Sequence, residues 1–219
     1  MSENLPTQRT KLDLFLEQMS ERASSPGRLA FIIDATASRG PTWDMATQLQ
    51  AEMFEEATRF GFLEVQLIFY RGISQCSHSG WTADGRTLAR LMSKVQCEFG
   101  MTKIGRALSH VRCEHERQTI NAVVFVGDSM EENHDELCGI AGALRVPLFA
   151  FQEGDDPQAS QTFAEMARLT HGAHCKFDAG AARQLGELLR AVAAFAAGGM
   201  KALKNLNTDS ARKLLTQLK

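Results

Sequence analysis

Apolar and amphipathic stretches alternate along the chain, and this alternation predicts strands separated by helices. Short continuous apolar runs are typical of strands that are buried on both faces. They occur in "RLAFIID", "LEVQLIFYRG", "INAVVFVGD", "RVPLFAFQEG" and, more briefly, "GAHCKFDAG". Residues 72–83 indicate a turn and a short edge strand. Between the runs, apolar residues recur three and four positions apart, which is typical of one helical face.

The helical spacing fixes the approximate positions of the helices. We expect them at residues 12–19, 43–60, 84–95, 104–111, 137–144, 163–170, 185–197 and 210–218. The pair Gly198-Gly199 should kink or end the long helix near the C-terminus. Thr42 is a candidate N-cap for the helix over 43–60.

Strands that alternate with helices of this length form βαβ units. We therefore predict an α/β fold, namely a doubly wound, mostly parallel six-stranded sheet with one antiparallel edge strand and helices on both faces. Residues 27–197 would form this domain, with helical extensions over 1–26 and 198–219.

Composition narrows the functional classes. The 219 residues suit one domain, and a formal net charge of -2 argues against nucleic acid as a partner. The five cysteines are scattered and include no CxxC pair, so we expect reduced thiols rather than disulfides. The N-terminus lacks the apolar segment of a signal peptide, and the apolar stretch 191–200 is too short to span a membrane. We expect a soluble, cytoplasmic protein.

Oxygen-bearing side chains follow two of the predicted strands. Asp34, Thr36 and Ser38 alternate with alanines after the first strand, so the three side chains would point the same way. Thr102 lies in a later loop, and Asp128 ends the strand "VVFVGD". Ligands of parallel sheets bind beyond the carboxyl ends of the strands. Hard oxygen donors with few carboxylates suit Mg²⁺ or Mn²⁺, and less well Ca²⁺.

Charge also favours a cation at this place. Two carboxylates ~4 Å apart repel by about 4 kcal/mol at an effective dielectric constant of ~20. Hydroxyls complete the coordination of a metal ion without adding negative charge. An ion held by only two carboxylates would remain electron-poor and would seek a further anionic oxygen from outside the chain.

These motifs together resemble the von Willebrand factor A (VWA) domain and its metal-ion-dependent adhesion site. The family's D-x-S-x-S motif is similar to "DATAS" at 34–38, its later threonine to Thr102 in "GMTKIGRAL", and its aspartate after the fourth strand to Asp128 in "VVFVGD". The resemblance covers roughly residues 27–197. It departs from the family pattern in three places. Thr36 stands for serine, Gly127-Asp128-Ser129 for T-D-G, and Gly100-Met101-Thr102 for the common G-G-T.

The resemblance implies a binding module rather than an enzyme. Asp34, Thr36, Ser38, Thr102 and Asp128 would hold a Mg²⁺-type ion that captures an acidic side chain of a partner protein. Intracellular bacterial members of the family often work with AAA-type ATPases or in complex assembly, which makes such a partner our expectation here.

The rim of the site should carry further contacts. Arg39, Trp43 and Asp44 follow the first loop, and Glu131 follows Asp128. We expect these four residues around the ion.

Several other interpretations stay open at this stage. The segment 34–38 is also compatible with a helix-capping turn. Ser129 and Glu132 have the spacing of a capping box at the start of a helix. In that case Glu131 and Glu132 would be solvated acids in the first turn of the helix. The metal could instead serve a hydrolase or phosphatase, or the site could be vestigial in a scaffold protein.

Other catalytic or metal motifs find little support. His110, Cys113 and His115 invite a zinc site, but His115 does not share the helical face of the other two and a fourth ligand is missing. The "GDS" at 127–129 lacks the base that a serine nucleophile needs, and the chain contains neither a GxGxxG motif nor a P-loop.

Overall fold

A six-stranded mixed sheet forms the centre of the computed structural model, which describes residues 26–40, 63–177 and 182–218. Its strands are β1 (Gly27–Asp34), β2 (Leu63–Arg71), β3 (Gln75–His78), β4 (Ala122–Gly127), β5 (Leu148–Glu153) and β6 (Ala173–Phe177). They lie in the order β3-β2-β1-β4-β5-β6, with β3 antiparallel at one edge and the other five strands parallel. This confirms the predicted α/β fold and its antiparallel edge strand. The expected helices over 12–19 and 43–60 lie outside the described residues.

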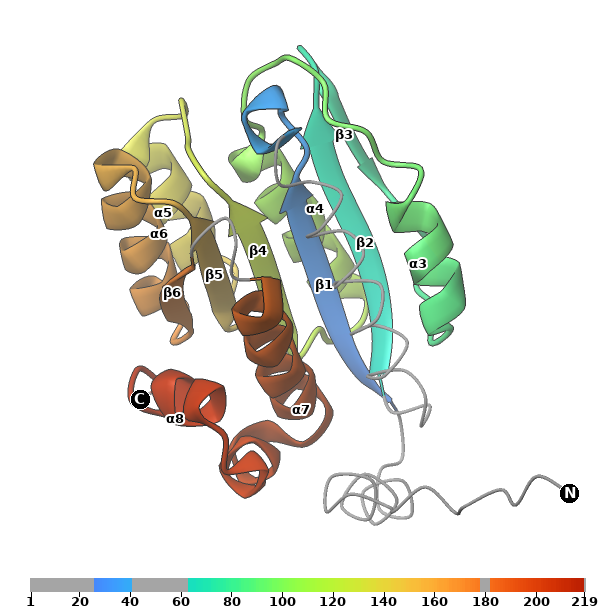
Figure 1. Ribbon diagram of the computed structural model, residues 1–219, viewed down its shortest axis with the longest axis vertical. Helices are drawn as coiled ribbons and strands as arrows, with labels where there is room; N and C mark the ends of the chain where they lie inside the picture. The colour runs from blue at the N-terminus through green and yellow to red at the C-terminus, as the bar shows by residue number, and fades with distance from the viewer. Residues whose placement is uncertain (1–25, 41–62, 178–181, 219) are drawn as a thin grey trace, which may run out of the picture.

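Helices cover both faces of the sheet (Figure 1). They are η1 (Ala37–Arg39), α3 (Gly85–Met92), α4 (Ile104–Arg117), α5 (His134–Gly142), α6 (Pro157–Leu169), α7 (Ala182–Leu206) and α8 (Asp209–Leu215). Helices α4, α5 and α6 pack on one face, whereas α3, α7 and α8 contribute to the core on the other. Within the described part of the chain, none of these helices is both long and apolar enough to cross a membrane.

The central strand β1 shows why the sheet is buried on both sides. Its side chains alternate between the two faces, so Phe31 and Ile33 belong to the core under α3 and α7, whereas Ala30 and Ile32 belong to the core under α4 to α6. Every residue of β1 is buried. A strand buried on both faces must be apolar throughout, which explains the uninterrupted run that predicted it.

The C-terminal segment folds back onto the sheet. Gly198 and Gly199 have non-helical backbone angles inside α7, which confirms the predicted kink. Beyond it, Leu214 of α8 is fully buried in the same core as β1. The side-chain amide of Gln217 pairs with edge strand β6, because its Oε1 accepts from the His174 N–H (2.9 Å) and its Nε2 donates to the His174 carbonyl (3.0 Å).

Candidate functional site

The strand order reverses between β1 and β4, and two of the predicted ligands lie at that point. Ile33 of β1 pairs with Val126 of β4 in parallel register. Asp34 and Asp128 therefore follow neighbouring strands at the same end of the sheet, where doubly wound sheets bind ligands. The Asp34 side chain is buried, whereas Asp128 is partly exposed.

The loop after β1 is tied together by its own polar groups. The Asp34 Oδ1 accepts a hydrogen bond from the Thr36 N–H (2.7 Å), and the hydroxyls of Thr36 and Ser38 lie 3.1 Å apart. An aspartate that accepts from a backbone N–H two residues on is typical of a turn. The turn and the gathered oxygens thus coexist, so the two interpretations of this segment do not exclude each other.

Tyr70, the only tyrosine of the chain, completes the surroundings of Asp34. Its buried hydroxyl donates to the Asp34 Oδ2 (3.1 Å), and the two residues pair in register across β1 and β2. Sequence analysis missed this contact. A polar aromatic residue at the end of a buried strand was the available signal, but only the register places it beside Asp34.

The electrostatics of this corner disfavour an isolated negative charge. Burial raises the pKa of Asp34 to about 6, and the charge of Asp128 raises it too, against the hydrogen bonds from Thr36 and the charge of Arg39 that lower it. Burial also raises the pKa of Tyr70, as do the charges of Asp34, Glu132 and Asp128. Tyr70 therefore remains a proton donor, and three carboxylates act on one buried corner.

Thr102, which is buried, is held by Glu131. The Glu131 Oε2 accepts from the Thr102 N–H and from the Thr102 hydroxyl, each at 2.9 Å, and the Glu131 N–H donates back to the same hydroxyl (3.2 Å). Glu131 is exposed, as expected, but it is not a first-turn acid, because α5 begins only at His134. One carboxylate oxygen of this exposed side chain thus fixes a predicted ligand.

The neighbouring acid, Glu132, caps a different helix from the one expected. Its carboxylate accepts from the Ile104 N–H (2.7 Å) and the Gly105 N–H (2.9 Å) at the start of α4. The predicted capping box of Ser129 and Glu132 was wrong, because α5 begins later and its N-cap is Asn133, whose side chain accepts from the Glu136 N–H (3.0 Å).

Arg39 does not stand at the rim. Its side chain is 1% exposed, and its guanidinium lies 2.8 Å from Glu153 at the end of β5 and donates to the Val126 carbonyl (3.4 Å). This corrects the rim prediction for Arg39. Its side chain turns into the protein, where the buried carboxylate of Glu153 pairs with its charge. The other two predicted rim residues, Trp43 and Asp44, lie outside the described residues.

A third loop meets the first two. In the segment between α3 and α4, Glu98 forms a parallel bridge with Thr36, and its N–H donates to the Ala35 carbonyl (3.0 Å). Figure 1 shows this segment passing η1 at the end of the sheet before α4 begins. The predicted ligands thus lie on three loops at one end of the sheet. Backbone pairing joins two of them, and charge couples Asp34 to Asp128.

The donor chemistry of these loops fits a hard divalent cation. The Thr102 hydroxyl donates to Glu131 and accepts from one N–H, which leaves one lone pair for an ion. Each Asp34 oxygen accepts one described hydrogen bond and keeps acceptor capacity. In the described ranges, no three His, Cys, Asp or Glu side chains gather as ligands. A cation here would therefore depend on the hydroxyls of Thr36, Ser38 and Thr102 as well as on the two aspartates.

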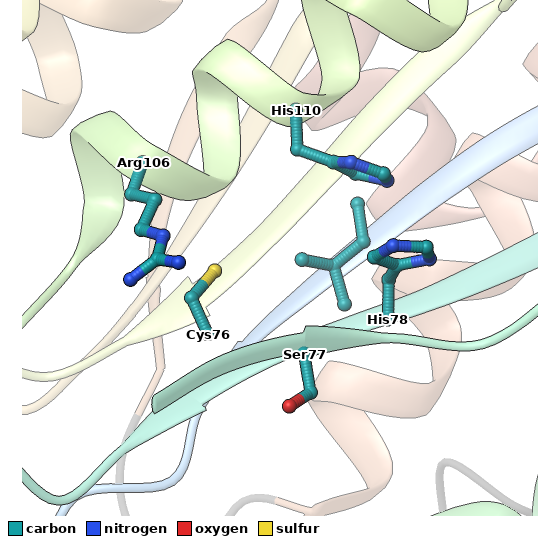
Figure 2. Close-up of a pocket in the computed structure, with 6 residues that line it drawn as sticks. Cys76, Ser77, His78, Arg106 and His110 are labelled. Carbon is teal, nitrogen blue, oxygen red and sulfur yellow. The ribbon is translucent and has the colours of Figure 1, made fainter. Parts of the chain in front are cut away.

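A shallow pocket lies elsewhere, between β3 and α4 (Figure 2). It measures about 230 Å³ and is lined by Ile68, Cys76, Ser77, His78, Arg106 and His110. The rings of His78 and His110 stack with centroids 4.1 Å apart, and His110 Nε2 lies 3.0 Å from the Gln66 Oε1.

The residues of the zinc motif serve other contacts. His110 belongs to this pocket, whereas the His115 ring accepts from the Ile120 N–H (3.0 Å) after α4, and Cys113 is exposed. These three residues therefore do not act as one ligand group.

Comparisons with known proteins bear on the fold. No protein-family model and no curated protein matches the chain. Similar solved structures include the pilus adhesin SpaC of Lactobacillus rhamnosus GG, with 11% identity, a TM-score of 0.62, and coverage of 80% of this chain and 30% of that chain. This chain therefore spans less than a third of the length of that adhesin.

Two further structures are matched over nearly their whole length. The vWF domain of the type V pili tip protein Mfa5 from Porphyromonas gingivalis has 9% identity, a TM-score of 0.58, and coverage of 78% of this chain and 95% of that chain. The SpRpn10 VWA domain has 14% identity, a TM-score of 0.52, and coverage of 76% of this chain and 95% of that chain. At such identities the likeness is one of fold. The chain has the fold of a von Willebrand factor A domain.

Proposed function

We propose that the chain is a protein-binding module that captures an acidic side chain of a partner through a divalent cation. Asp34, Thr36, Ser38, Thr102 and Asp128 would hold the ion, with Mg²⁺ or Mn²⁺ preferred over Ca²⁺. When bound, the ion supplies an open coordination position for a carboxylate from outside the chain. Participation in complex assembly, or work with an AAA-type ATPase in a bacterial cytoplasm, is the setting in which we place this module.

The observation that carries the proposal is that Asp34 and Asp128 follow neighbouring parallel strands at one end of the sheet, beside the paired hydroxyls of Thr36 and Ser38. Burial and the charge of Asp128 both raise the pKa of Asp34, so the pair is strained when both groups are ionised. Arg39 is a described cation whose charge acts on Asp34, and its guanidinium is already paired with Glu153. A divalent ion would relieve the repulsion between the aspartates.

Calorimetric titration of the purified chain with MgCl₂ and MnCl₂ tests the ion directly. We expect saturable binding to the parent protein and at least tenfold weaker binding to Asp128→Asn. Because Asp128 raises the pKa of Asp34, this variant should be as stable as the parent without metal, or more stable. Asp155→Asn is the matched control, since Asp155 is an exposed acid after β5 that pairs with Lys176 and is not one of the predicted ligands.

Two results would contradict the proposal. One is the absence of saturable Mg²⁺ or Mn²⁺ binding by the parent at millimolar concentrations. The other is equal loss of binding in Asp128→Asn and Asp155→Asn. A pull-down with and without chelator then tests whether partner capture depends on the ion.

A further inference from the structure

Large apolar side chains are exposed beside the proposed metal site. Within the described residues, four large hydrophobic side chains are exposed, and three of them belong to two loops at this end of the sheet. These are Ile73 (84% exposed), Phe99 (89%) and Met101 (54%), whereas the fourth, Met200 (39%), lies just beyond the kink of α7. Single exposed apolar residues are ordinary, but a group at one place marks an interaction surface.

The two loops touch through their backbones. A Cβ atom placed on Gly100 would lie 1.9 Å from the carbonyl oxygen of Gly72, so no side chain fits between the loops. Gly72 itself has a φ of +60°, which glycine adopts without strain. Ile73 follows one glycine, and Phe99 and Met101 flank the other. Ile73, Phe99 and Met101 are here called the apolar rim. The backbone contact between Gly72 and Gly100 holds the segments that carry them side by side.

The apolar rim is continuous with the predicted ligands. Phe99 follows Glu98, whose backbone bridges Thr36, and Met101 precedes Thr102. A molecule whose carboxylate reaches the cation would therefore meet these side chains next.

Two arginines anchor the loops that carry the apolar rim. Arg71 donates to the Gln96 carbonyl (3.0 Å) and lies 3.1 Å from the Glu98 carboxylate. Arg106 of α4 donates to the Ser74 carbonyl (3.0 Å). An anchored surface loses little conformational entropy on binding, which favours affinity. The region carries acids as well as bases. Glu98 pairs with Arg71, and Glu131 and Glu132 accept from backbone N–H groups, whereas Lys103 and Arg106 add positive charge that complements an acidic ligand.

We infer that the partner presents an aspartate or glutamate with large apolar residues within about three positions of it, so that the cation and the apolar rim bind one peptide segment together. This rests on the proposed function, and it adds the chemistry of the residues that flank the captured acid. A purely electrostatic contact would leave the apolar rim exposed in the complex.

Selection from a random peptide library displayed on phage, with the full chain immobilised in Mg²⁺, tests this inference. We expect enriched peptides to contain an acid flanked by Leu, Ile, Phe or Met, and to be released by chelator. For the peptide that binds most tightly, Phe99→Ser should weaken binding roughly tenfold or more, because the variant loses an aromatic contact that the peptide would bury in the complex. Met101→Ser should weaken it less, and Met200→Ser serves as the matched control with unchanged affinity. All three positions are exposed, so the variants should fold normally.

The outcomes separate the two proposals. Chelator-sensitive acidic peptides without an apolar bias, or with equal affinity for Phe99→Ser and the parent, overturn this inference and leave the metal-dependent function standing. Apolar peptides that bind equally well with and without chelator overturn the inference that the cation and the apolar rim bind one segment together. They also overturn the proposed role of the ion in partner capture. Failure to enrich any peptide also overturns the inference.

Discussion

Glu131 holds Thr102 through three hydrogen bonds, two donated to its carboxylate and one donated by its own N–H. The two residues lie 29 positions apart and join the loop before α4 to the loop after β4. An acid that sequence analysis placed at the surface therefore positions a predicted ligand.

Replacing Glu131 should affect both stability and metal affinity. Glu131→Ala leaves the buried Thr102 N–H without its carboxylate acceptor, and we expect unfolding free energy to fall by about 1 to 3 kcal/mol in urea denaturation. Mg²⁺ affinity should fall roughly tenfold, as is common when a residue behind a ligand is removed. Glu131→Gln keeps an acceptor and should lose less, and Glu116→Ala on the exposed side of α4 is the control. Unchanged stability in Glu131→Ala would show that the contact is unimportant.

Glu132 should stabilise α4 from outside the helix. Its carboxylate accepts two N–H groups of the first turn and carries a negative charge at the positive end of the helix dipole. Glu132→Ala should therefore lower the unfolding free energy by about 1 to 2 kcal/mol, as the loss of other N-terminal caps does. Glu132→Gln should lower it by less, because the amide oxygen can still accept a hydrogen bond. Urea denaturation measures both, and a loss no larger than that of Glu116→Ala would refute the cap.

The buried pair of Arg39 and Glu153 should show strong coupling. Removing one partner leaves a buried charge uncompensated, so Arg39→Met should destabilise the chain by about 3 to 5 kcal/mol. The double variant Arg39→Met/Glu153→Met should lose much less than the sum of the single variants, because neither charge remains.

The surface pair of Arg168 and Glu165 offers the comparison. Both side chains are more exposed than those of the buried pair, and the same double-mutant cycle should yield far weaker coupling. If the losses in unfolding free energy of the two single variants simply add up in the double variant, then Arg39 and Glu153 are not energetically coupled.

Gln217 should protect the backbone of edge strand β6. Its amide occupies both the N–H and the carbonyl of His174, as a neighbouring strand would. In Gln217→Ala, the His174 amide should exchange with solvent at least tenfold faster, and stability should fall by about 1 kcal/mol. Gln161→Ala, at an exposed position of α6, is the control, and equal exchange in parent and variant would argue against the pairing.

His174 should make the chain sensitive to acid. Burial lowers its pKa from 6.5 to about 4, with smaller effects of Lys176 and Lys213. The folded state then binds fewer protons than the unfolded state between these values, so this histidine contributes stability that is lost as pH falls from 6.5 to 4. The loss should be about 1 to 2 kcal/mol, since the ring is only partly buried.

The pH effect is isolated by comparing variants. His174→Gln removes the titrating ring, so the difference in unfolding free energy between parent and variant should shrink as pH is lowered through this window. Denaturation at pH 7, 6, 5 and 4 measures the difference. A constant difference would show that His174 does not titrate as inferred.

Sequence analysis and the structure agree most closely on the sheet and its helices. The apolar runs that predicted β1, β4 and β5 lie in strands whose residues are all buried, and the kink at Gly198-Gly199 was predicted from glycine alone. Such patterns are local, since burial on both faces forces a continuous apolar run and helical burial forces a spacing of three and four. Placing Asp34 and Asp128 at one end of the sheet needed only the rule for parallel strands.

The tertiary structure alone decided what the acids and the buried arginine do. Glu131 and Glu132 lie 27 to 29 residues from the groups that they contact. Arg39 points inward to Glu153 and the Val126 carbonyl, which belong to strands far along the chain. Sequence can determine which side chains are polar and where they lie along the chain. It cannot determine which of several nearby donors a long, flexible carboxylate will meet, because that depends on how loops from separate elements come together.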